Sequence, residues 1–154
     1  MGTQQILLIV LSVIIVGAAI AVGIQMFNNQ SFTANRSAIA ADAQSYASQI
    51  VQYYKTPISQ GGAGGAIAAG GEKKIADFIG FTEGEAGGAW GAGEYGIDND
   101  NGFYVIHSVT DTTAVIKGTG KEEQGGQNPV ITTTITFPAG TISAEAGLED
   151  VEES

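Results

Sequence analysis

An uncharged, apolar segment at the start of the chain limits what this sequence can fold into more than any other feature. Residues 1–35 contain no charged side chain, and within residues 6–24 only Ser12, Gly17 and Gly23 are neither alanine nor strongly apolar. As a helix rising 1.5 Å per residue, about 19 such residues span the hydrocarbon core of a bilayer. The sequence therefore predicts a membrane-competent helix near the N-terminus.

A cleaved secretory signal is the first alternative for this segment. Such signals begin with a basic region, whereas the residues before the apolar run are small or polar and neutral: Gly2, Thr3, Gln4 and Gln5. A helical pattern also continues where a cleavage site and a break would be expected. We therefore favour a retained helix.

Helical periodicity extends well beyond the apolar run. Apolar residues recur at spacings of three, four or seven, which is typical of an amphipathic helix, at Phe32, Ile39, Ala43, Tyr46, Ile50 and Tyr53. Pro57 restricts the residue before it and lacks a backbone donor, so the helix should end near Thr56. We expect one helix over residues 4–55, about 75 Å long, with a local distortion near Gly17 and Gly23. Its first half needs a partner outside the monomer, whereas its second half packs on the chain's own domain.

The rest of the chain predicts a small β-domain with glycine-rich loops. A short helix is expected at 72–79, and alternating β-prone residues indicate strands at 103–109, 113–119 and 130–137. Strands linked in sequence by turns favour an antiparallel meander, and a helix followed by a sheet gives an α+β class. The expected parts are an apolar helix half (1–27), an amphipathic half (28–57), a glycine-rich region (58–102), a sheet (103–145) and an acidic tail (146–154).

Composition excludes several classes of function. The chain has 6 Lys and Arg against 16 Asp and Glu, a formal charge of −10, which argues against a nucleic-acid partner. It has no cysteine and a single histidine, His107, which strand alternation places on one face with Phe103, Val105 and Val109. No nucleophile motif or metal-ligand spacing is present, so we expect neither an enzyme nor a cofactor.

One acidic turn offers a weak calcium candidate. Asp98 and Asp100 belong to the segment Asp-Asn-Asp-Asn-Gly, which resembles the start of a calcium loop. The EF-hand pattern, however, requires glycine at its sixth position and glutamate at its twelfth, and neither is found. The favoured interpretation is a turn rich in Asp and Asn that precedes a strand.

The order of these parts resembles that of type IV pilins and pseudopilins. The resemblance rests on an uncharged N-terminus, a polar residue at position 5, an apolar segment of about 20 residues, an amphipathic continuation, a loop and then strands. It departs from the family at Gln5, where a glutamate is usual, and at Val22, where a proline is common. Either Met1 follows a removed leader peptide or Met1 is the initiator.

The resemblance implies a non-enzymatic subunit of an extracellular filament on the cell surface, anchored in the inner membrane before assembly. The implied partners are identical subunits in a homopolymer, the cytoplasmic membrane and the pilus assembly machinery. The assembly residues would be Met1 and Gln5 together with two small pairs that permit close helix approach, Gly17 with Ala21 and Ala19 with Gly23. The alternative is a monomeric, membrane-anchored binding domain on the surface or in the periplasm.

Overall fold

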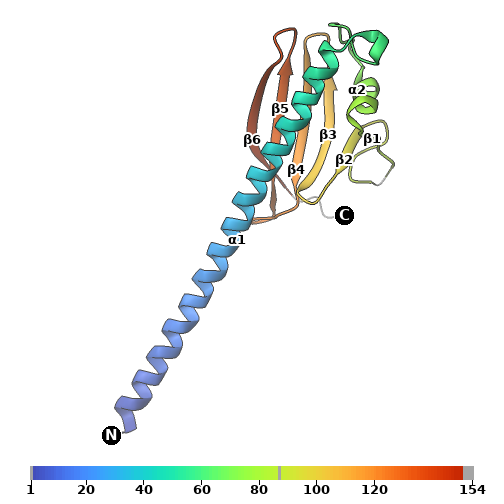
Figure 1. The fold of residues 1–154 in the computed structure, drawn as a ribbon. Helices are drawn as coiled ribbons and strands as arrows, with labels where there is room; N and C mark the ends of the chain where they lie inside the picture. The colour runs from blue at the N-terminus through green and yellow to red at the C-terminus, as the bar shows by residue number, and fades with distance from the viewer. Residues whose placement is uncertain (1, 87, 151–154) are drawn as a thin grey trace.

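The computed structural model describes residues 2–86 and 88–150. A long helix leads into a single sheet, so the predicted α+β class is confirmed (Figure 1). The elements, in order, are α1 (Gly2–Lys55), the 3-10 turn η1 (Ile58–Gln60), α2 (Glu72–Ile79), β1 (Thr82–Glu83), β2 (Tyr95–Asp98), β3 (Gly102–Val109), β4 (Thr113–Gly120), β5 (Gln127–Thr136) and β6 (Thr141–Asp150).

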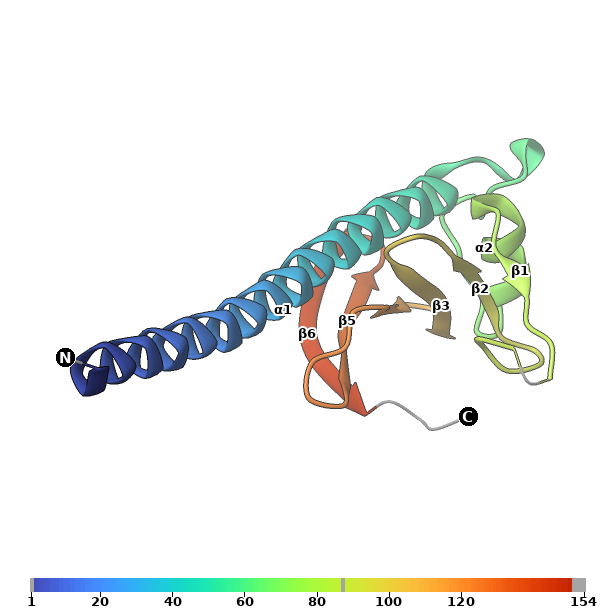
Figure 2. The ribbon, with the colours of Figure 1, turned by 90° about the horizontal axis from the view of Figure 1, so that it is seen from below.

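Helix α1 is continuous over its 54 residues. The expected local distortion near Gly17 and Gly23 does not interrupt the helix. Each glycine lowers helix propensity by only about 1 kcal/mol, and no part of the described domain contacts this stretch to bend it. The N-terminal half consequently projects from the domain as a stalk in line with the packed half (Figure 2).

The glycine-rich loop after α1 closes the end of that helix. Its backbone amides donate to carbonyl groups in and just after the last helical turn: Ala63 to Tyr53 at 2.9 Å, Gly65 to Tyr54 at 2.8 Å and Gly64 to Thr56 at 2.8 Å. A Cβ atom on Gly62 would lie only 2.2 Å from the Thr56 carbonyl oxygen. Glycine is therefore required for the loop to fold back this closely.

The six strands form one open antiparallel sheet in the order β1-β2-β3-β4-β5-β6, which confirms the predicted meander. In β5, the alternate residues Ile131, Thr133 and Ile135 are buried on the face that packs against α1. Figure 2 shows α1 lying across one side of this curved sheet. The hydrophobic core lies between them.

One face of the second half of α1 supplies the helical side of the core. Its buried residues are Phe32, Ile39, Ala43, Ala47, Ile50 and Tyr53. Aromatic contacts extend this packing: the Tyr46 ring lies 5.0 Å from both Phe81 and Tyr104, and the Tyr54 ring stacks on Phe137 at 4.5 Å. The predicted inward face of the helix is confirmed, with Tyr46 half-buried rather than fully buried.

The sheet is larger than the sequence pattern indicated. Strands β1 and β2 lie within the stretch expected to be glycine-rich loop, and β6 carries the ladder to Asp150, so residues 146–150 belong to the sheet rather than to a tail. The register of β3 also shifts between Ile106 and Ser108. This bulge turns Val109 into the core while His107 stays exposed, so the predicted grouping of these two on one face was wrong.

Candidate functional site

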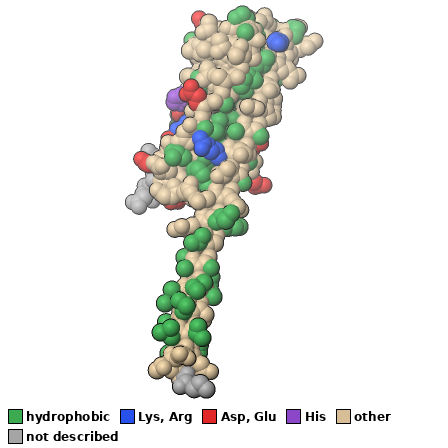
Figure 3. All heavy atoms as spheres, turned by 90° about the vertical axis from the view of Figure 1, so that its left-hand side faces the viewer, with side chains coloured by type: hydrophobic (Ala, Val, Ile, Leu, Met, Phe, Trp, Pro, Cys, Tyr) green, Lys and Arg blue, Asp and Glu red, His purple; other side chains and the backbone are tan. Residues whose placement is uncertain are grey.

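The exposed half of α1 is the most unusual surface of the molecule. Its large apolar side chains, from Ile6 to Phe27, keep between 51% and 71% of their surface exposed. By length and composition the helix could cross a membrane, and no part of its most apolar stretch is buried by the described domain. Figure 3 shows apolar side chains covering this stalk, in contrast to the mixed surface of the domain.

The predicted assembly residues all lie on this stalk, apart from Met1, which lies outside the described residues. Gln5, Gly17, Ala19, Ala21 and Gly23 are exposed, and a Cβ atom added to either glycine would meet nothing within 4 Å. The packing of the monomer therefore gives no reason for glycine at these two positions. Any requirement for a small residue there must come from outside the chain.

The small pairs fall on two sides of the helix. Gly17 with Ala21, and Ala19 with Gly23, are each one turn apart and so share a face. The two pairs are offset by two residues, or about 200° around the axis, which places them on nearly opposite faces. The stalk therefore has a small-residue surface on each of two nearly opposite sides.

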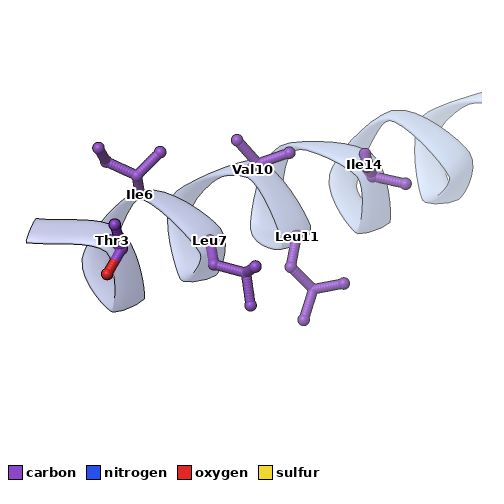
Figure 4. Close-up of a pocket in the computed structure, with 6 residues that line it drawn as sticks. All are labelled: Thr3, Ile6, Leu7, Val10, Leu11 and Ile14. Atoms are coloured by element: carbon purple, nitrogen blue, oxygen red, sulfur yellow. The ribbon is translucent and has the colours of Figure 1, made fainter.

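Nearer the N-terminus, the stalk carries a shallow groove between rows of side chains (Figure 4). It is lined by Thr3, Ile6, Leu7, Val10, Leu11 and Ile14. All of these residues come from one helix, and no other described element forms a second wall. Such a surface is a set of ridges and grooves of the kind that another helix packs into, rather than an enclosed ligand site.

A polar cluster fixes the packed half of α1 to the sheet. Asp42, the single acidic residue of α1, accepts hydrogen bonds through Oδ2 from the Tyr104 hydroxyl at 2.9 Å, Asn101 Nδ2 at 2.8 Å and Asn99 Nδ2 at 3.2 Å. Partial burial works to raise the pKa of Asp42, but these bonds outweigh it and hold the pKa below its ordinary value. Burial and the bond to Asp42 raise the pKa of Tyr104.

The sequence analysis did not identify Asp42 as a functional or structural residue. The available signal was its position: it precedes Ala43, a residue of the buried stripe, and it has no basic residue within one turn. An isolated carboxylate at the margin of a buried face requires donors, and the Asn side chains of the β2–β3 turn provide them.

The calcium candidates in that turn have other surroundings. Asp98 pairs with Lys121 at 2.8 Å, and Asp100 is exposed. Asn99 Oδ1 accepts from the backbone amides of Asn101 and Gly102, which makes the segment an Asx turn ahead of β3. Among residues 2–86 and 88–150, no cluster of three or more His, Asp or Glu side chains suits a metal ion.

A second hollow lies on the face of the sheet opposite α1, and we call it the sheet-face groove. It has a volume of roughly 500 Å³ and is lined by Gly88, Ala89, Trp90, Glu94, Phe103, Val105, His107, Lys117, Asn128, Glu149 and Asp150. No sequence pattern predicted this groove, because its residues come from a loop and four different strands.

Comparison with protein-family models, with curated proteins and with solved structures gives no match. Only the architecture can be compared with a known class of protein. A long apolar N-terminal helix that packs by its second half on an antiparallel sheet is compatible with a pilin-like architecture.

Proposed function

We propose that the protein is the structural subunit of an extracellular, type IV pilus-like helical filament that polymerises through the exposed half of α1. The observation that carries the proposal is the contrast along a single helix. The half up to Phe27 is apolar on every side and exposed, whereas the half from Phe32 has one face packed on the domain.

The size of the exposed apolar surface supports an assembly role. Fifteen large apolar side chains of α1 lie in the open. Burying each would contribute about 1.5–3 kcal/mol, or roughly 20–45 kcal/mol together. A folded domain is stable by only about 5–15 kcal/mol, so leaving this surface in water would favour aggregation over any soluble monomer. A membrane before assembly and neighbouring helices afterwards would each cover it.

The continuity of α1 favours a polymer over a simple anchor. An anchor alone does not require a rigid connection between membrane and domain, whereas here one unbroken helix joins the stalk to the core. Asp42 and the aromatic contacts then fix the angle between that helix and the sheet. A fixed angle would let each added subunit repeat the same geometry, which helical symmetry requires.

The two small pairs fit a bundle rather than a dimer. Gly17 with Ala21 and Ala19 with Gly23 face nearly opposite directions, so each helix would receive a close neighbour on both sides. With a neutral Gln5, registration between subunits would rest on apolar packing and on hydrogen bonds of the amide.

In this proposal the subunit is held in the inner membrane by residues 6–24 and is then moved into the polymer by pilus assembly machinery. The sheet domain would lie on the outside of the filament at the cell surface. The mature partners would be identical subunits, with no role for nucleic acid, in keeping with the formal charge of −10.

Imaging of sheared surface material from the source cells tests the proposal. We expect thin filaments by negative-stain electron microscopy, with this chain identified in them by mass spectrometry. Recovery of the chain only from detergent-extracted membranes would instead support the anchored, monomeric binding domain.

A further inference from the structure

The sheet-face groove combines an aromatic floor with a polar rim. Trp90, Phe103 and Val105 provide apolar surface, and the surrounding side chains are charged or hydrogen-bonding. Its volume of roughly 500 Å³ lies within the range of about 300–1,000 Å³ that small-molecule sites occupy. The groove lies on the opposite face of the sheet from α1 and so is separate from the surface proposed for assembly.

Two glycines leave room for the Trp90 ring against the backbone. A Cβ atom on Gly96 would lie 2.9 Å from a carbon of the indole ring, and one on Gly84 would lie 2.3 Å from another. The ring therefore lies directly against the backbone of the β1–β2 region, which holds it in a fixed place beside the groove. The indole Nε1 has no hydrogen-bond partner among residues 2–86 and 88–150, although it is shielded from solvent. A ligand in the groove could therefore contact the Trp90 ring but not this shielded atom.

The rim of the groove carries both donors and acceptors. Lys117 donates to Glu149 at 2.6 Å across β4 and β6, and the Asp150 carboxylate accepts from the Gln127 side chain at 2.8 Å. Glu94 accepts from the backbone amide of Gly91 at 2.9 Å. Each carboxylate has about four lone-pair sites, so all three keep acceptor capacity. His107 and Asn128 add an imidazole and an amide.

Charge narrows the class of ligand. Three carboxylates against one lysine, in a chain with a formal charge of −10, disfavour phosphates, uronates and other anions. Glu149 is already neutralised by Lys117, and the other two acids accept amide donors, so no cation is needed to satisfy them. A neutral hydroxyl can both donate and accept hydrogen bonds, so it suits a rim that carries both kinds of group.

We propose that the sheet-face groove binds a neutral carbohydrate. The C–H face of a pyranose ring would lie on the apolar floor of Trp90 and Phe103, and its hydroxyls would bond the rim at Asn128, His107 and Glu94. This binding function does not depend on polymerisation, and it would belong to a filament subunit and to an anchored domain alike.

The single tryptophan of the chain makes the test direct, because Trp90 is both the proposed floor and the only indole fluorophore. The full chain would be held in a zwitterionic, sugar-free detergent and titrated with neutral gluco-, galacto- and manno-oligosaccharides. Parallel titrations would use uronate oligosaccharides and a lysine-rich peptide. We expect a saturable change in Trp90 emission with at least one neutral series, with a dissociation constant of about 1 mM or tighter, and none with uronates.

Variants then locate the site. Asn128→Ala and His107→Ala should each weaken binding by about tenfold, the loss expected for one hydrogen bond in a polar site. Thr136→Ala is the matched control, since it lies on the same face of β5 beyond the groove and should bind as the native chain does. The proposal is overturned if no neutral sugar gives a saturable response up to about 10 mM, if only the lysine-rich peptide does, or if neither groove variant weakens the response.

Discussion

Along α1, the residues up to Phe27 lie in the open on all sides, whereas from Phe32 onward one face packs on the sheet. Both halves have the same backbone conformation and both are rich in apolar residues. They differ in where polar residues fall: the packed half confines apolar side chains to one stripe, and the exposed half has no polar face at all. The second half therefore has the residue pattern of a helix that packs one face on a domain. The first half has the pattern of a helix that is covered on every side, and the described domain does not cover it.

The packed half also shows what close approach to a sheet requires. Ala43 and Ala47 are fully buried between the larger Ile39 and Ile50, so the helix backbone can come near the strands while the isoleucines fill the gaps. In the stalk, Gly17 and Gly23 have no such partner within the monomer. In the packed half, small residues thus permit close approach to the sheet, whereas nothing described in the monomer requires them in the stalk.

The largest expected effect comes from filling the small positions of the stalk. Replacing both glycines, as Gly17→Leu with Gly23→Leu, should abolish polymerisation because the added side chains would keep neighbouring helices apart. Membrane insertion should be unchanged, since leucine is more apolar than glycine. Filament yield by negative stain and membrane fractionation of the same cells measure the two outcomes.

The matched control is Ala18→Leu with Val22→Leu, which adds bulk to the same region without filling either small pair. Cells with this control variant should form filaments in normal yield. Normal filaments from the glycine double variant would show that close helix approach is not what holds the polymer together.

A core truncation separates the two halves by stability. Ile39→Ala should lower the free energy of unfolding of the domain by about 2–5 kcal/mol, because it opens a cavity against the sheet. Ile15→Ala removes the same atoms from the stalk and should change that free energy by less than about 0.5 kcal/mol. Urea unfolding of the full chain in detergent, followed by Trp90 fluorescence, gives both values. Equal losses would mean that the stalk contributes to domain stability, contrary to its exposure.

The Asp42 cluster tests how the packed half is fixed. Because hydrogen bonds hold the pKa of Asp42 below its ordinary value of 3.8, its contribution to stability is full above that value and is lost as the pH falls through the lowered pKa. Asp42→Asn should therefore cost about 1–3 kcal/mol at neutral pH. The gap between variant and native chain should close in strong acid.

Unfolding free energies measured at pH 7 and in strong acid check this dependence, with Asp100→Asn, an exposed change in the neighbouring turn, as control. A gap that stays constant with pH would show that the charge of Asp42 is not what the cluster stabilises.

Sequence patterns predicted the parts of the fold that depend on periodicity. The end of α1, the bounds of α2 and the buried face of β5 all follow from local rules. Strand β6 did not, because Thr141–Asp150 is rich in Ala, Gly and Glu and becomes a strand only by pairing along β5. The bulge at His107 could not be predicted either, because no residue type in this strand marks the point where the register shifts.

The candidate sites divide in the same way. The stalk could be read from the sequence because its signal is contiguous, whereas the Asp42 cluster joins α1 to a turn 57 or more residues later. The sheet-face groove depends on the fold even more, since a loop and four strands meet there. Contacts between segments far apart in the chain leave no periodic pattern in the sequence, so they could not be predicted from it.

The smallest expected effect concerns Gln5. Its neutral amide can donate and accept hydrogen bonds but cannot neutralise an ammonium, so Gln5→Leu should remove about 0.5–1.5 kcal/mol per subunit from the polymer and still allow filaments to form. The temperature at which purified filaments dissociate should fall by a few degrees, as followed by light scattering. Gln4→Leu, the neighbouring amide, is the matched control and separates a positional effect from a general gain in hydrophobicity. Complete loss of filaments from Gln5→Leu alone would assign registration to this one side chain rather than to the apolar packing that distinguishes the stalk from the packed half.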